Sequence, residues 1–195
     1  MRRLAALLVL VPAVAHAEAP SSLSLAVATG ASLPAPSTSL GVGLSVGLEA
    51  SWRPRPWLAL GLAVDGGQRT AHGSGTDGGL DFDWRTVARE LWIAPELQLR
   101  LPLAPGLSVG LGGGPALVLV STVNGGSLLG DAFPDGRESS AVLGVRAGVG
   151  AEWELGGGAL VLDVGYGRAR ISHIATGAGA HLDAIGVRVG YRFWF

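Results

Sequence analysis

From Leu40 to Trp52 the chain alternates between apolar residues and residues that are small or polar. Every second position, starting at Leu40, is leucine, valine, alanine or tryptophan, and the positions between are glycine, serine or glutamate. Because successive side chains of a β-strand point to opposite faces, this period of two predicts a strand with one apolar face. The same alternation recurs in residues 139–155 and 182–195. Helical spacing of three and four is missing from these segments, and so many glycines disfavour helices.

Eight segments of this kind can be recognised along the chain. The predicted strands are 22–30, 40–52, 57–66, 83–101, 107–121, 139–155, 159–171 and 182–195. Tight turns rich in proline and glycine follow the second, fourth and sixth of them. The other connections are predicted to be longer polar or glycine-rich loops, near 31–39, 67–82, 122–138 and 172–181. Short turns at one end and long loops at the other are typical of transmembrane β-barrels.

The composition of the two faces decides which kind of barrel is expected. A soluble eight-stranded barrel is apolar inside and polar outside. Here the second face is mostly glycine, serine and alanine, and the first is a continuous apolar stripe. From Leu91 to Leu101 the stripe spans roughly 25 Å at ordinary strand rise and tilt, which matches the apolar band of a membrane barrel. We therefore expect a lipid-facing exterior and a polar lumen, with Arg85 and Arg89 at or beyond the outer interface.

Aromatic residues are expected to mark the two membrane interfaces. Those at the tight-turn end are Trp52, Trp57, Trp153, Phe193 and Phe195, and those nearer the loop end are Tyr166, Phe82 and Trp84.

The amino terminus has the pattern of a secretory signal peptide. Arg2 and Arg3 precede an apolar run from Leu4 to Ala15 that is too short to cross a bilayer as a helix. Small residues at positions 15 and 17 suit a signal peptidase, so we expect residues 1–17 to be removed by cleavage after Ala17, with cleavage after Ala15 as the alternative. Residues 18–195 then form a single barrel domain.

Composition excludes several other classes of protein. Hydrophobic residues make up 48% of the chain and the formal net charge is −1, which is incompatible with a disordered chain. The 32 glycines show no period of three, so a collagen is excluded, and the absence of cysteine excludes a disulfide scaffold. No basic stripe is present, so we expect no nucleic-acid partner.

The last eight residues, Arg188-Val189-Gly190-Tyr191-Arg192-Phe193-Trp194-Phe195, resemble the carboxyl-terminal signal of bacterial outer-membrane barrels. With the signal peptide and the eight alternating strands, the chain is similar to the small eight-stranded bacterial outer-membrane β-barrel family. The resemblance implies an integral protein of a Gram-negative outer membrane, in contact with its lipid, with both termini periplasmic and four long loops extracellular. It also implies recognition by the barrel assembly machinery through Arg188, Gly190, Phe193 and Phe195. Members of such a family differ in function, so the fold does not define an activity.

The alternation also selects the charged side chains that face the lumen. Those expected to form a lumen charge network are Glu49, Glu96, Arg100, Arg146, Glu152, Glu154, Asp163, Arg188 and Arg192, and the same parity turns Asp65 and Glu90 inward. Isolated buried charges are costly, so these groups are expected to pair. An eight-stranded barrel is just wide enough for side chains to fill it, which favours a closed lumen.

Two other functions remain open from the sequence. Many inward positions are glycine, which leaves space for water and allows a narrow passive channel for small solutes. The stretch from Ser172 to Gly177 faintly resembles the His-x-Ser motif of a lipid A deacylase, but Ala175 occupies the position of the nucleophile. His173 and His181 lack a convincing third metal ligand, and no phosphate-binding loop is present, so neither a metal nor a cofactor is expected.

The sequence thus predicts a non-catalytic integral outer-membrane β-barrel with a structural or surface-interaction role and a lumen filled by ion pairs. The ligand, any surface partner and the oligomeric state are left undefined by the sequence.

Overall fold

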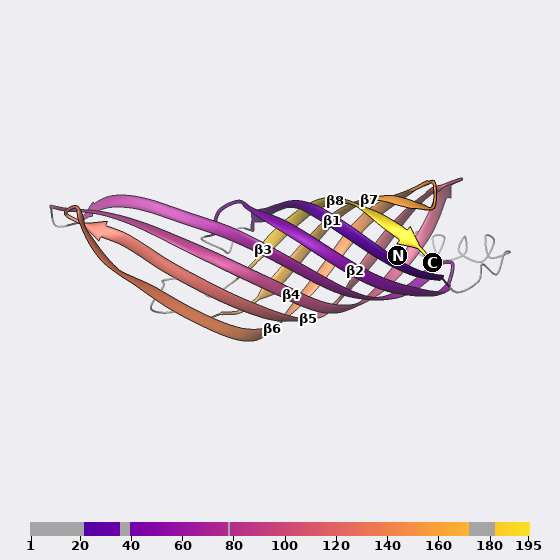
Figure 1. Cartoon of the computed structure of the whole chain (residues 1–195), viewed down its shortest axis with the longest axis horizontal. Coiled ribbons are helices and arrows are strands. Elements are labelled where there is room, and N and C mark those ends of the chain that lie inside the picture. The colour runs from indigo at the N-terminus through magenta and orange to yellow at the C-terminus, as the bar shows by residue number, and fades with distance from the viewer. Residues whose placement is uncertain (1–21, 36–39, 78, 172–181) are drawn as a thin grey trace, which may run out of the picture.

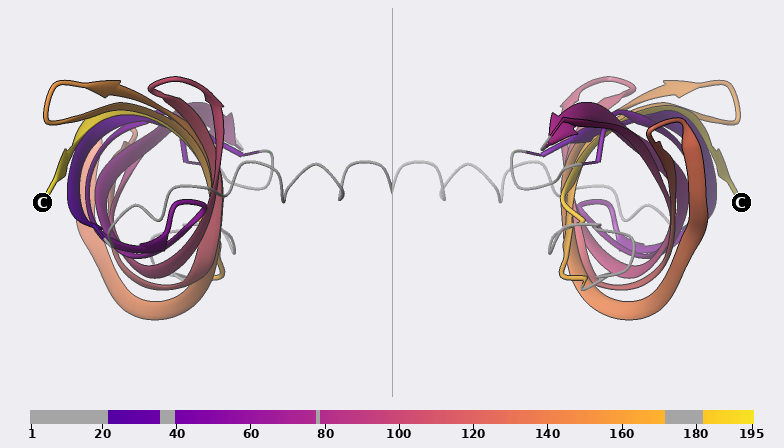
Figure 2. Two further views of the ribbon diagram at one scale, coloured as in Figure 1. Left: turned by 90° about the vertical axis from the view of Figure 1, so that its right-hand side faces the viewer. Right: turned by 90° about the vertical axis from the view of Figure 1, so that its left-hand side faces the viewer.

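The computed structural model describes residues 22–35, 40–77, 79–171 and 182–195 and shows a closed antiparallel β-barrel (Figure 1). Each strand pairs with its neighbours in the sequence, and the first strand closes the ring by pairing with the last. The strands are β1 (Ser22–Pro34), β2 (Gly43–Arg55), β3 (Leu58–Asp77), β4 (Leu80–Ala104), β5 (Leu107–Leu128), β6 (Asp131–Leu155), β7 (Gly158–Ala169) and β8 (Ala184–Trp194). The views in Figure 2 show the strands winding around a common axis. The prediction of an all-β, eight-stranded up-and-down barrel is confirmed.

The strands are strongly inclined to the barrel axis. Followed through paired residues from strand to strand, the register leaves β1 at Leu23 and returns to it at Leu33, ten residues further along. For eight strands this stagger corresponds to a tilt of about 40°, within the range of membrane barrels. The first and last strands close the barrel by pairing with each other. At the tight-turn end of this pair, the Phe195 amide donates to the Leu23 carbonyl at 2.9 Å.

Side chains alternate between an apolar outer surface and a lumen of small and charged residues. On β6, Leu143 is 81% exposed and Val145 is 57% exposed, whereas the side chain of Arg146 between Val145 and Ala147 is only 14% exposed. Trp52, Trp57 and Trp153 are likewise exposed near the tight turns. The apolar face therefore points outward, as the pattern predicted. Among the described residues, no helix is long and apolar enough to cross a membrane.

Four neighbouring strands extend well beyond the other four. β3, β4, β5 and β6 continue past the ends of β1, β2, β7 and β8 and form a curved four-stranded sheet at the end away from the tight turns (Figure 1). Gly79 and Gly130, with φ of +83° and +88°, lie in the short turns that close its two hairpins. The predicted long loops at 67–82 and 122–138 are therefore wrong, because nearly all of these residues continue the strands. We call this sheet, residues 70–90 and 119–142, the extension.

Two aromatic residues expected near the outer interface and one residue expected in the apolar stripe do not lie on the outer face. Trp84 and Phe82 face inward and cover Gly73 and Gly75 of the paired strand, where an added Cβ would lie 2.8 Å from either ring. They therefore do not belong to an outer aromatic belt. Leu40 precedes β2 and is only 3% exposed, so it is not part of the outward stripe.

Candidate functional site: the barrel lumen

Charged side chains fill the lumen at the tight-turn end in a lower layer, formed by Arg100, Glu152, Arg192 and Glu49. Arg192 of β8 is 3% exposed, and its Nη1 donates to the Glu49 carboxylate at 2.9 Å. Its Nε lies 3.1 Å from Glu152, which also pairs with Arg100. Hydroxyls complete the layer, because Ser24 and Ser51 accept hydrogen bonds from Arg192 at 3.0 and 2.7 Å. Strands on different sides of the barrel are thus tied together at this level.

Two cation–π contacts lie below this layer, at the tight-turn end of the lumen. The guanidinium of Arg53 lies 4.4 Å from the centroid of the Trp194 ring, and that of Arg100 lies 5.9 Å from it. Cations at these distances are attracted to the face of an indole ring. Trp194 therefore links the end of β8 to β2 and β4 inside the lumen.

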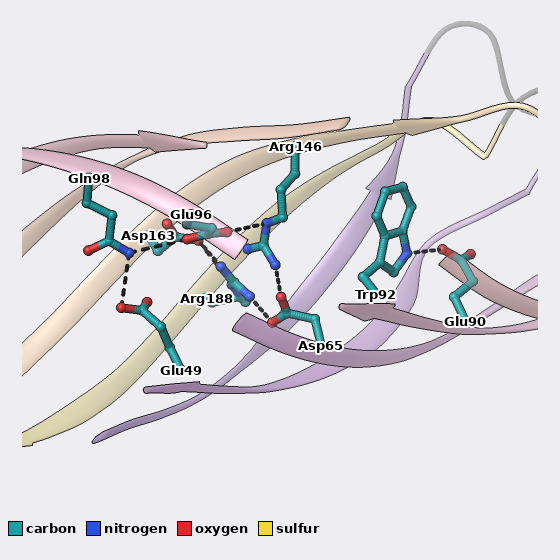
Figure 3. Close-up of polar contacts among 9 residues, drawn as sticks. All are labelled: Glu49, Asp65, Glu90, Trp92, Glu96, Gln98, Arg146, Asp163 and Arg188. Carbon is teal, nitrogen blue, oxygen red and sulfur yellow. Dashed lines mark hydrogen bonds and ion pairs between the residues drawn. The ribbon is translucent and has the colours of Figure 1, made fainter. Parts of the chain in front are cut away.

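A middle layer, formed by Asp65, Arg146, Arg188, Glu96 and Asp163, crosses the lumen further from the tight turns (Figure 3). Asp65 of β3 accepts from both Arg146 of β6 and Arg188 of β8, one carboxylate oxygen serving each. Arg146 also contacts Glu96 at 2.8 Å, and Arg188 contacts Asp163 at 2.6 Å. Both arginines are thereby paired twice, which compensates for the loss of hydration of their charges.

Gln98 joins the lower and middle layers. Its amide nitrogen donates to Glu49 at 3.0 Å and to Glu96 at 3.2 Å, so one side chain bridges two carboxylates (Figure 3). A neutral donor between two like charges lowers their repulsion without adding a further charge.

Two small cavities lie on either side of the middle layer. One, of about 80 Å³, is lined by Glu49, Gln98 and other residues of the lower layer, and the other, of about 90 Å³, reaches Arg69 and Trp92. Asp65, Arg146 and Arg188 line both of them. Each cavity has room for a few water molecules. The middle layer therefore lies between the two spaces, and these three of its side chains face both of them.

An upper layer, formed by Arg69, Glu90 and Trp92, lies beyond the second cavity. Arg69 is 1% exposed, contacts Glu90 at 2.6 Å and donates to the Asp183 carbonyl at 2.9 Å. The indole of Trp92 donates to the other carboxylate oxygen of Glu90 at 3.0 Å (Figure 3). The Trp92 ring lies over Gly144 and Gly167, so it spans to the far wall of the barrel.

Apolar side chains then fill the lumen where the four short strands end. We call this cluster the apolar plug; it comprises Leu40, Ala71, Ala88, Trp92, Ala94, Ala116, Val118, Val120, Ala169, Ile171 and Leu182. Val118 and Leu182 are fully buried. The lumen is thus not polar throughout, as expected from the sequence, but changes from charged to apolar along its axis.

Most of the residues predicted for the lumen charge network meet in these layers. Glu154 does not: it is exposed at the end of β6, beside Gly106 and near Arg53. The residues predicted for assembly lie on β8 and at its end. Arg188 and Gly190 face the lumen, and Phe193 and Phe195 are exposed on the outer face.

Arg69 belongs to the lumen but was missed from the sequence, and it donates to the main-chain carbonyl of Asp183. Arg69 lies in a segment predicted to be a loop, although continuing the alternation of 57–66 by three residues would have placed it inward. Asp183 has the parity of the outward stripe but is only 1% exposed, with its carboxylate 3.1 Å from the Tyr166 hydroxyl. Its carboxylate also lies 3.9 Å from Arg168, and both Tyr166 and Arg168 are exposed on the outward face of β7, so Asp183 is buried beneath outer-face side chains.

The candidate catalytic stretch, Ser172 to Gly177, lies outside the described residues, as do His173 and His181. Within the described segments, no group of three His, Cys, Asp or Glu side chains is arranged to hold a metal ion.

Comparison with known proteins agrees with this architecture. A family model for the outer membrane protein beta-barrel domain matches residues 4–193, and the chain belongs to this family. It is therefore a β-barrel protein of a Gram-negative outer membrane. No curated protein sequence matches the chain significantly.

Solved structures show the same fold at low sequence identity. A major outer membrane protein from Thermus thermophilus is 15% identical, with a TM-score of 0.54 over 91% of this chain and 100% of that one. OprG from Pseudomonas aeruginosa is 14% identical, with a TM-score of 0.50 over 91% of this chain and 97% of that one. Neisserial surface protein A is 20% identical, with a TM-score of 0.44 over 89% and 97% of the two chains. At these identities the likeness concerns the fold alone.

Proposed function

We propose that this protein is a non-catalytic outer-membrane barrel with a structural or surface-interaction role, and that its lumen is closed to solutes. The observation that carries the proposal is the series of closures along the lumen: the lower, middle and upper layers and the apolar plug. Each contains contacts between strands that are not neighbours in the ring, such as Arg192 with Glu49, Asp65 with Arg146, and Trp92 with Gly167. A solute would have to break several ion pairs and then displace packed apolar side chains.

In the proposed orientation the tight turns and both termini are periplasmic and the extension projects from the cell. Short turns at one end of the barrel and much longer hairpins at the other support this arrangement, because outer-membrane barrels have short periplasmic turns. The extension would then be a rigid sheet at the cell surface, where it can interact with other molecules.

A narrow passive channel is the second candidate. The two cavities favour it, because they approach each other across the middle layer, where Asp65, Arg146 and Arg188 line both. Rearrangement of these three side chains would join the two spaces, although the upper layer and the plug would still lie in the path.

Liposome swelling distinguishes the two functions. The mature protein is refolded into liposomes, a heat-dependent gel shift verifies that the barrel has formed, and swelling in small sugars and amino acids is recorded beside a known small channel. We expect no swelling above that of empty liposomes. Swelling comparable to the known channel would overturn the closed-lumen proposal, and a change of ion preference in Arg146→Gln or Glu152→Gln would then identify the route.

A further inference from the structure

Three arginines lie on the outward face of the extension, directly beyond the apolar band. The last apolar row across the four strands contains Leu91 and Leu119, paired with each other. The next outward row runs Gln68, Arg89, Ser121 and Ser139, the following row runs Thr70, Val87, Val123 and Arg137, and the one after contains His72, Arg85 and Gly125. We call these three rows the basic face.

The side chains of the basic face point away from the lumen. Arg85 and Arg89 are exposed, whereas Thr86 and Ala88, which alternate with them, are buried. The Ser139 hydroxyl donates to that of Ser121 at 3.1 Å in an exposed pair. The basic face is therefore a surface formed by all four long strands, with small side chains between the arginines.

The paired residues of the basic face carry positive charge. Among the residues whose pairing is described, its rows contain three arginines and His72 but no acidic residue; the register shift between Asn124 and Gly126 leaves the third row without a paired residue on β6. The outward carboxylates of β4, Asp83 and Asp81, lie nearer the hairpin tip and accept hydrogen bonds from Ser127 and Thr76. The arginines in the lumen, in contrast, are matched by carboxylates. The charge of the basic face is thus available to an anion from outside the chain.

The two membrane interfaces of the barrel differ in the positive charge on their outward faces. At the tight-turn end the outward face is aromatic, and the arginines Arg53, Arg100 and Arg192 are directed into the lumen; Arg55 in the first turn is the exposed exception. Guanidinium groups bind phosphate through paired, charge-assisted hydrogen bonds. Outward arginines that could bind lipid phosphates are therefore concentrated at the extension end of the barrel, and the tight-turn end presents mainly aromatic side chains.

We propose that the basic face binds the phosphate groups of a phosphorylated glycolipid in the outer leaflet, whose acyl chains lie along the apolar stripe below it. This proposal rests on the orientation proposed above. Arg85 and Arg89 are four residues apart on one face, about 13 Å along the strand, which suits a headgroup with two separated phosphates. A lipid uses the phosphate-binding rows and the adjoining apolar band together, whereas a soluble polyanion uses the arginines alone.

The test measures lipid binding by the refolded mature protein in phosphatidylcholine nanodiscs. The probes are fluorescent diphosphorylated lipid A and the same lipid after enzymatic removal of its phosphates. We expect the phosphorylated form to bind at least tenfold more tightly. In the triple variant Arg85→Gln, Arg89→Gln, Arg137→Gln this preference is expected to disappear, because the three charges are lost from an exposed surface.

A matched control changes two exposed arginines outside the extension, at the end of β7 and directly after it, Arg168→Gln with Arg170→Gln. This variant is expected to keep the full preference for the phosphorylated lipid. Equal binding of the two lipids by the wild-type protein, an unchanged preference in the triple variant, or an equal loss in the control would each overturn the site. Competition by soluble polyphosphate as effective as that by lipid A would overturn the lipid assignment.

Orientation is measured separately by labelling a peptide tag inserted at Gly79 in intact cells. We expect labelling without permeabilisation. The nanodisc assay does not depend on which way the barrel faces in the cell, so failure of the lipid site and failure of the orientation give different results.

Discussion

Asp65 holds the middle layer together at the scale of single residues. Alternation along the chain places it on the lumen face, but its two partners come from β6 and β8, far away in the sequence. Each arginine has one further carboxylate, Glu96 or Asp163. Removing Asp65 would therefore leave each of the two guanidinium groups with one carboxylate partner instead of two.

The substitution Asp65→Asn is expected to lower the free energy of unfolding by roughly 3 kcal/mol, because it breaks a buried ion-pair network while keeping the size of the side chain. Urea titration of the barrel in detergent micelles measures the change. Glu154→Gln is the control, because Glu154 is exposed outside the layers, and it is expected to change stability by less than about 0.5 kcal/mol. A similar small change for Asp65→Asn would show that the shared carboxylate does not stabilise the barrel.

At the scale of strands, the extension shows where the alternation of apolar and polar residues stops predicting a strand. From Gln68 to Thr76, β3 alternates polar residues on the outside with mostly small residues inside. Within the bilayer the outer residues must be apolar, so the two faces contrast strongly. Beyond the apolar band the outer face meets water and becomes polar, and the contrast disappears although the strand continues. For this reason the sequence pattern suggested loops and missed Arg69.

The pairing of β1 with β8 requires close approach of the two backbones. A Cβ at Gly190 would lie 2.2 Å from the carbonyl oxygen of Val27, whereas a Cβ at Gly186 would meet nothing within 4 Å. Gly190 was predicted to act in recognition by the assembly machinery. The structure gives it a steric role in the closed barrel as well.

We expect Gly190→Ala to destabilise the refolded barrel by about 1–3 kcal/mol, because the added methyl group forces the closing strands apart. Gly186→Ala, on the same face of the same strand, is the control and is expected to behave as the wild type. Folding into detergent without any assembly protein, followed by the gel shift and urea titration, measures both. Identical stability of the two variants would leave recognition as the only role proposed for Gly190.

For the whole molecule, the closures of the lumen act in series. The charged layers lie between the tight turns and the apolar plug, and the plug lies where the short strands end. Opening one layer joins neighbouring spaces but does not open a path through the barrel.

The variant Asp65→Ala with Arg146→Ala removes one charge of each sign from the middle layer. We expect it to remain non-conducting in planar bilayers, because the Arg69–Glu90 pair and the plug still block the lumen. Adding Arg69→Ala and Glu90→Ala removes the upper ion pair as well, and this variant is also expected to remain non-conducting, because the lower layer and the apolar plug are still in place; the gel shift verifies that the barrel has formed. Conductance in the first variant would identify the middle layer as the only closure.

The sequence by itself determined the class of the protein, because lipid imposes a strict requirement on the outer face of every strand. The apolar stripe showed the period of two and which face of each strand points outward. It therefore also predicted most of the charged residues of the lumen, such as Arg146 and Arg192. Tertiary structure decided which charges meet, because ion pairs such as Arg188–Asp65 depend on the stagger between strands. It also decided the length of the extension and the position of the apolar plug, since neither lies where the bilayer constrains the alternation.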